Sequence, residues 1–145
     1  MSESVGQVVE LFVSQRGKST RFNRTILELD RDGVIDDKFY AKSLERSVLL
    51  TSLDSYELAL KNGIEMSYGV LGENILIDYN PYELSVGSRL KLGEVTVEIT
   101  QNCTICEHLS SIDQTLPSLL KEDRGIFVKV VEAGFIEKEA KIYLL

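Results

Sequence analysis

The amino-acid sequence predicts a mainly β protein, a closed or partly open antiparallel β barrel that carries two or three short helices. Three observations indicate this fold class: several short runs alternate apolar and polar residues, the ten glycines stand singly between such runs, and few stretches have a helical pattern. A barrel is favoured over an open sheet because closure removes exposed strand edges. A length of 145 residues fits one domain, so residues 1–145 are expected to fold as a unit.

The clearest predicted hairpin lies in the second half of the chain. Residues 95–100 alternate apolar and polar side chains, so Val95, Val97 and Ile99 would share one face of a strand. Residues 89–92 alternate in the same way. Gly93-Glu94 between the two runs is typical of a two-residue hairpin turn with Gly first.

Other segments complete the expected barrel. A second pair of strands is expected at 126–131 and 141–145, on either side of a loop that contains Gly134. Further strands are expected at residues 7–13, 25–29, 47–51 and 75–79.

Two stretches predict helices. Asp54 is expected to cap the first, because Glu57 three residues later completes a capping box. Gly63 suits the position just after the end of that helix. A second short helix is expected over residues 116–121, with Pro117 in its first turn.

Composition excludes several classes of protein. The net charge of −7 argues against nucleic acid as a partner, because phosphate neutralisation favours a basic face. No apolar run approaches the roughly 20 residues that a membrane crossing needs, and Glu3 is untypical of a signal peptide. We therefore expect a cytoplasmic protein without a membrane partner, whose two cysteines are thiols rather than a structural disulfide.

Both cysteines and the single histidine fall within one short segment, Cys103-Thr104-Ile105-Cys106-Glu107-His108. A structural zinc site would need a fourth ligand, and covalent haem would need the histidine directly after Cys106. Exchange of a dithiol and a disulfide through Cys103 and Cys106 is a further reading, although that motif usually opens a helix in a βαβ unit. Two cysteines that only pack in the interior are the remaining alternative.

A second candidate element is the glycine-containing segment from Gly69 to Asn74. Glycines at Gly69 and Gly72 allow the backbone to approach a ligand closely or to adopt a positive φ. Glu73 and Asn74 then place a carboxylate and an amide at the start of an apolar strand. A tight turn without any ligand fits the same composition.

Taken in order, these segments resemble the MOSC domain family, which includes the C-terminal domain of molybdenum cofactor sulfurases and stand-alone bacterial proteins. The resemblance rests on Gly69 to Asn74 as a Gly-x-x-Gly-Glu-Asn element, on Leu84 to Gly93 as Leu-x-Val-Gly-x-x-Leu-x-Leu-Gly, and on Cys106 followed by Leu109. Weaker matches lie at residues 33–37, 46–50 and 124–126, so that the similarity covers nearly the whole chain.

The resemblance implies a barrel that binds the molybdenum cofactor or carries sulfur. Cys106 matches the implied catalytic thiolate, which would be a ligand of molybdenum or the site of a persulfide. Family members reduce N-hydroxylated compounds, and here a sulfur donor or an electron-transfer protein would be the partner. A thiolate is a soft ligand and a nucleophile, which agrees with either role.

The implied cofactor-binding residues are Glu73, Asn74, Arg124, Lys18 and Arg21. The last three could supply positive charge for the phosphate of a molybdopterin-type cofactor, as could Arg46.

The chain also departs from the family pattern. Ile105 replaces the proline before the cysteine, Phe39 stands where the family has a histidine, and Cys103 is an additional thiol. The additional thiol favours sulfur carriage, because it could resolve a persulfide on Cys106. Two other functions stay open: a non-catalytic accessory module of cofactor biosynthesis, and a Cys-x-x-Cys dithiol redox protein.

Overall fold

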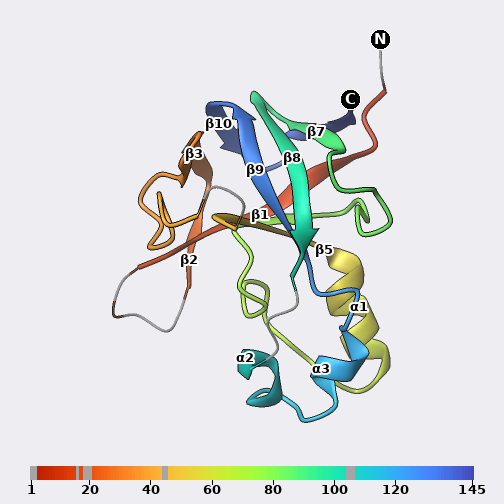
Figure 1. The fold of residues 1–145 in the computed structure, drawn as a ribbon. Helices are drawn as coiled ribbons and strands as arrows, with labels where there is room; N and C mark the ends of the chain where they lie inside the picture. Colours follow the sequence, from red (N-terminus) through yellow and green to blue (C-terminus); the bar gives the residue numbers. More distant parts are fainter. Residues whose placement is uncertain (1–2, 16, 18–20, 44–45, 104–106) are drawn as a thin grey trace.

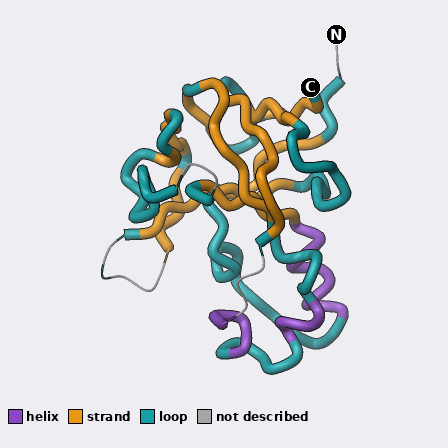
Figure 2. Tube along the Cα trace, viewed as in Figure 1, coloured by secondary structure: helices purple, strands orange, loops and turns teal. Residues whose placement is uncertain are grey.

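The computed structural model describes residues 3–15, 17, 21–43, 46–103 and 107–145. Lys18 and Cys106, two of the predicted site residues, lie outside the described residues. The molecule is a β barrel with a group of short helices below one end of it (Figures 1 and 2). No helix in the described part of the chain has the length and apolar character that a membrane crossing requires.

The barrel is closed by seven strands. Their order around it is β11-β7-β8-β9-β5-β6-β1, and β1 pairs with β11 to complete the circle. Their bounds are β1 Gly6–Ser14, β5 Val48–Ser52, β6 Ile75–Ile77, β7 Arg89–Leu92, β8 Val95–Asn102, β9 Ile126–Glu132 and β11 Lys141–Leu144. All the pairings are antiparallel except β5 with β6, which run parallel. The predicted mainly β barrel is therefore confirmed.

Four further strands extend the barrel. β2 (Arg21–Arg24) pairs with the end of β1 and places Arg21 opposite Ser14. A second sheet joins β3 (Ile26–Asp30) to β4 (Gly33–Val34) and to β10 (Gly134–Glu137).

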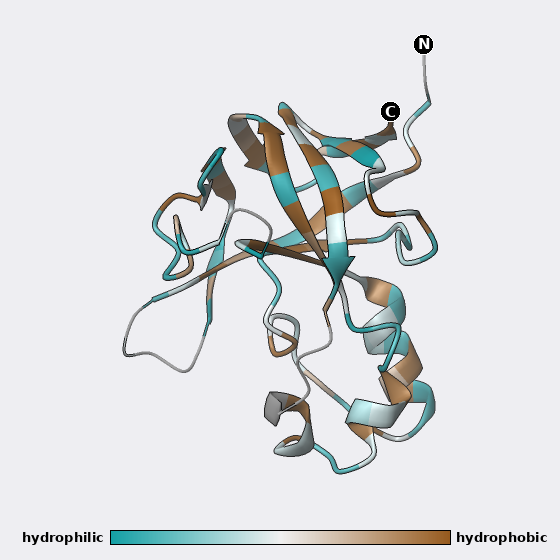
Figure 3. Cartoon of the chain, in the orientation of Figure 1, coloured by the Kyte–Doolittle hydropathy of each residue, from teal (hydrophilic) through white to brown (hydrophobic). Residues whose placement is uncertain are grey.

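The alternation of residues in β8 positions the barrel core as predicted. Val95, Val97 and Ile99 are buried and pack with residues of β1, β5 and β9. Figure 3 shows the same alternation as brown and teal bands along β8 and β9. β7 and β8 form the predicted hairpin, and Gly93 between them has a φ of 60°, which suits glycine.

The C-terminal strand pair differs from the prediction. Both predicted segments are strands, but β9 pairs with β8 and β5, whereas β11 pairs with β7 and β1. The expected loop around Gly134 contains β10. Partners distant in sequence determine these pairings, and local alternation carries no information about them.

The helices pack against the barrel through a second apolar cluster. They are α1 (Leu53–Lys61), α2 (Glu107–Ser110) and α3 (Leu116–Leu119). Leu71 and Leu76 are fully buried in this cluster, together with Leu109 of α2 and Leu116 of α3.

The N-terminal cap of α1 is Ser52 rather than Asp54. The Ser52 hydroxyl accepts a hydrogen bond from the Asp54 backbone N–H, so the helix begins one residue before Asp54. Gly63 has a φ of 79° just beyond the end of α1, as predicted. Pro117 lies in the first turn of α3.

Candidate functional site

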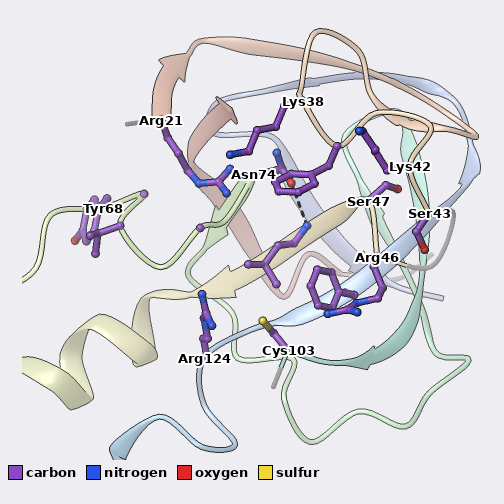
Figure 4. A pocket seen from close by; sticks show the side chains of 16 residues that line it. Arg21, Lys38, Lys42, Ser43, Arg46, Ser47, Tyr68, Asn74, Cys103 and Arg124 are labelled. Atoms are coloured by element: carbon purple, nitrogen blue, oxygen red, sulfur yellow. Dashed lines mark hydrogen bonds between the residues drawn. The ribbon is translucent and has the colours of Figure 1, made fainter. Parts of the chain in front are cut away.

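A cavity of about 730 Å³ lies where β5 and β9 begin and β8 ends. Its wall combines segments that are distant in sequence: β2, residues within 38–43 and 46–47, the 69–74 turn, Cys103 and Arg124 (Figure 4). Small-molecule sites usually have volumes of about 300–1,000 Å³. The cavity is therefore large enough for a molecule of cofactor size.

The cavity wall is strongly cationic. Five basic side chains line it, and no carboxylate side chain does so among the described residues. The five are Arg21, Lys38, Lys42, Arg46 and Arg124. The whole chain carries a net charge of −7, so this local concentration of positive charge would favour an anionic ligand over a cationic one.

Arg124 is the deepest of these cations. It is 6% exposed, and its Nη2 donates to the carbonyl oxygen of Leu71 at 3.1 Å. Its Nε and Nη1 are buried and have no hydrogen-bond partner among the described residues. Buried polar groups are nearly always hydrogen-bonded, so these two donors are available to a ligand.

Arg21 lies beside Gly72, as Arg124 does. A Cβ atom added at Gly72 would meet Arg21 Nη2 at 3.4 Å and Arg124 Nη2 at 3.8 Å, so the missing side chain leaves room for both guanidinium groups. Burial lowers the pKa of Arg21, and Arg124 lowers it further, while Asp37 and Glu73 oppose the shift. The guanidinium groups of Arg21 and Arg124 are thus close together and partly shielded from water.

Glu73 lies behind the 69–74 turn and is not part of the cavity wall. It is fully buried, and its Oε2 accepts hydrogen bonds from the Tyr56 hydroxyl at 2.6 Å and the Gly69 N–H at 3.2 Å. Its Oε1 has no partner among the described residues. Burial raises the pKa of Glu73, and the bond from Tyr56 offsets this only in part. The carboxyl therefore holds the turn in place from inside.

Asn74 lines the cavity, but its amide is occupied by the protein. Its Oδ1 accepts from the Leu49 N–H at 3.1 Å, and its Nδ2 donates to the Phe12 carbonyl and to Asp37 Oδ1. Asp37 is itself buried and accepts from the Ser14 N–H at 2.6 Å. This network ties the cavity wall to β1 and β5.

Cys103 and Arg124 are held together by the ladder between β8 and β9. The Cys103 N–H donates to the carbonyl of Gly125 at 3.0 Å, directly beyond the paired residues Asn102 and Ile126. Cys103 is 4% exposed and lines the cavity. Figure 4 shows its sulfur and the Arg124 guanidinium group on the same side of the cavity.

Aromatic rings border the same cavity. Phe39 and Tyr68 are 42% and 49% exposed, and both line it. Arg46 stacks over the ring of Phe127, with 5.2 Å between the guanidinium carbon and the ring centroid. Rings at an opening of this kind offer flat apolar surfaces to a ligand.

The structure thus brings three of the predicted site residues, Arg21, Asn74 and Arg124, to one cavity and places Glu73 just behind it. Cys106 and Lys18 lie outside the described residues. Sequence reasoning assigned no role in the site to Lys38, Lys42 or Tyr68, whose types and spacing carry no recognisable pattern. It noted Arg46 and Cys103 but had no means of placing them in the cavity wall.

The described residues hold no group of three or more His, Cys, Asp or Glu side chains that could bind a metal ion. They do fit the anionic part of a cofactor, because Arg124 Nε and Nη1 have no partner among these residues and Gly72 leaves space beside the Arg124 guanidinium group.

Solved structures with the same fold show low sequence identity to this chain. The YuaD protein from Bacillus subtilis is 16% identical with a TM-score of 0.85, covering 99% of this chain and 98% of that chain. YiiM from Geobacillus stearothermophilus is 15% identical with a TM-score of 0.78, covering 97% and 75%. YiiM from Escherichia coli is 15% identical with a TM-score of 0.66, covering 94% and 69%.

Comparison with curated protein sequences finds no match to this chain. A family model described as MOSC domain, in contrast, matches residues 36–143, which include the 69–74 turn, Cys103 and Arg124. The chain therefore belongs to the MOSC domain family.

Proposed function

We propose that this protein binds a molybdopterin-type molybdenum cofactor in the cationic cavity. The two buried nitrogen atoms of Arg124 that have no partner among the described residues carry this proposal, because a phosphate is an acceptor suited to them. Arg21 lies beside Gly72 together with Arg124 and would neutralise the same group. Lys18, outside the described residues, is the third proposed phosphate ligand.

The 69–74 turn would shape the site rather than bind the cofactor through side chains. Glu73 is engaged with Tyr56 and Gly69, and Asn74 with Leu49. Both residues are proposed to keep the turn close enough for its backbone and Gly72 to face the ligand. The exposed rings of Phe39 and Tyr68 are placed to cover a flat pterin.

Cys106 is the proposed thiolate ligand of molybdenum or, in the sulfur-carrier version, the proposed persulfide site. When bound, the molybdenum centre would supply the chemistry for reducing N-hydroxylated compounds, with electrons from a partner protein. The residues of this chain would bind and orient the cofactor and limit its contact with water.

Co-expression with the cofactor pathway, followed by metal analysis, tests the proposal. We expect about one molybdenum per wild-type chain and none in Cys106→Ser, since a single protein thiolate would hold the metal. Cys103→Ser is the matched control and should keep its metal. Metal retention by Cys106→Ser would disprove the ligand assignment.

A second arm tests the phosphate contact. Arg124→Met should lower cofactor occupancy about ten- to a hundredfold, because a hydrogen bond to a charged group contributes about 1.5–3 kcal/mol. Arg31→Met removes an exposed charge in the turn between β3 and β4 and should leave occupancy unchanged. Equal occupancy in both variants would contradict the placement of the phosphate.

The sulfur-carrier version has its own test. After incubation with a cysteine desulfurase and cysteine, mass spectrometry should find an added mass of about 32 Da on Cys106, since a reactive thiolate takes up sulfane sulfur. An unmodified Cys106 together with absent molybdenum would favour the alternative of a non-catalytic accessory module.

A further inference from the structure

We propose that Cys103 is a second reactive thiol of this cavity, which exchanges with small anionic disulfides and carries the anionic half as a mixed disulfide. The proposal does not depend on molybdenum binding or on Cys106. It rests on the position of one sulfur beside a buried guanidinium group, two of whose nitrogen atoms have no partner among the described residues.

The first step is access to the cavity. Cys103 is 4% exposed, and its side chain forms part of the wall of a cavity of about 730 Å³ (Figure 4). A reagent can therefore reach the sulfur from within the cavity, and the cavity selects which reagents arrive. The ladder bond from Cys103 N–H to the Gly125 carbonyl fixes the residue in this position.

The second step is charge. Arg124 adjoins Gly125, and its Nε and Nη1 are buried without a partner among the described residues. Arg46, which stacks on Phe127, and three further cations line the same space. A disulfide that carries carboxylates would pair with these groups as its sulfur atoms approach Cys103, whereas a cationic disulfide would be repelled.

The third step is the exchange itself. The Cys103 thiolate attacks one sulfur of the disulfide, a new S–S bond forms to Cys103, and the old S–S bond breaks. The second half leaves as a thiolate, and the proton lost from Cys103 passes to it or to water. The protein thiol is oxidised and the disulfide is reduced, so no other oxidant is needed.

The consequence is that the ratio of disulfides to free thiols in solution would determine whether the cavity is blocked by an adduct on Cys103. An anionic adduct on Cys103 would occupy the space in front of Arg124 and compensate its charge. It would thereby compete with any other anion for the cavity. Reduction by a free thiol would reverse the adduct and reopen the site.

The test compares the rates of two disulfides on the Cys106→Ser protein, in which Cys103 is the sole remaining thiol. The anionic probe is dithiobis(nitrobenzoate), which carries two carboxylates and releases a coloured thiolate. The cationic probe is cystamine. An unstructured peptide of residues 99–106 with the same Cys106→Ser exchange gives the intrinsic preference of the thiol.

We expect the ratio of anionic to cationic rates to exceed that of the peptide about tenfold or more, in the range of electrostatic steering. High salt should reduce the excess. Arg124→Met should reduce it as well, whereas Lys138→Met, which removes a cation paired with Glu10 away from the cavity, should not. A ratio equal to that of the peptide, or reaction only in denaturant, would overturn the proposal.

If Cys106→Ser fails to fold, peptide mapping of the adduct in the wild-type chain gives the same answer. The anionic probe should then label Cys103 in preference to the cationic probe, and labelling of Cys106 alone would overturn the proposal. Both experiments use protein without cofactor. Their failure therefore leaves the molybdenum proposal standing, and a protein without molybdenum could still show the selectivity.

Discussion

The buried carboxyl of Glu73 makes a specific prediction about the pH dependence of stability. Burial raises the pKa of Glu73 above its ordinary value of 4.5. Between that value and the raised pKa, the folded protein holds a proton that the unfolded chain has released. Stability therefore falls as pH rises through this interval, and the contribution is fully present below the ordinary value.

The exchange Glu73→Gln removes this titration while keeping the shape of the side chain. Its carbonyl can still accept from Tyr56 and Gly69, whereas its amide nitrogen adds a buried donor that costs about 1–3 kcal/mol at every pH. The free energy of unfolding of the wild type should therefore fall relative to the variant by about 1.4 kcal/mol per pH unit above 4.5. The difference becomes constant once the raised pKa is passed.

Urea unfolding followed by circular dichroism, at pH values from 4 to 8, measures this difference. Glu57→Gln is the matched control, because it removes the same charge from the exposed face of α1. Parallel pH profiles of the wild type and Glu73→Gln would refute the reasoning. A difference that grew in favour of the wild type with rising pH would mean that the protein stabilises the charged carboxylate.

Three further predictions concern packing and the turn. Gly72→Ala and Gly87→Ala should each lose about 1–3 kcal/mol of stability, since both residues have a φ above 90°. Binding of a pterin phosphate, measured by calorimetry, should be weaker only in Gly72→Ala, because a Cβ there would lie close to Arg21 and Arg124, whereas nothing lies within 4 Å of a Cβ at Gly87. Tyr82→Phe should cost about 1–3 kcal/mol in urea unfolding, because the Ser52 N–H loses its acceptor at 2.8 Å. Leu76→Ala should cost about 2–5 kcal/mol, since the side chain is fully buried in the helix-facing cluster. An unchanged unfolding midpoint in Tyr82→Phe or Leu76→Ala, or equal pterin affinities in the two glycine variants, would contradict the corresponding contact.

The features of the barrel that depend on neighbouring residues in the sequence were predictable. Alternation at residues 95–100 sets which side chains of β8 face the core, and Gly93 sets the turn before it. Strand partners were not predictable in the same way. β11 closes the barrel by pairing with β1, more than a hundred residues earlier in the chain, and the pattern within residues 141–145 does not say which strand lies beside it.

The candidate site likewise has features that the local sequence predicts and features that depend on distant segments. The spacing of Gly69, Gly72 and Asn74 predicted a tight turn, with or without a ligand, because glycine and asparagine have distinctive backbone preferences. The inward position of the Glu73 carboxyl, which accepts from Tyr56, was not predictable. A carboxylate at the start of a strand can face either the interior or a ligand. Arg21 was chosen for its charge, and Arg124 for its charge and its match to a family element, but only the folded chain brings both of them beside Gly72.

The energetics of that pair give a reason for the arrangement. Two guanidinium groups that share one small space repel each other, and burial makes the repulsion larger than it would be in water. Asp37 and Glu73 offset the cost for Arg21, yet Arg124 still has two donors without partners among the described residues. A protein selected for stability alone would gain by replacing Arg124 with an apolar residue that fills the same volume. Under the proposed function, an anion bound in the cavity would accept hydrogen bonds from these two donors and reduce the repulsion between the two guanidinium groups.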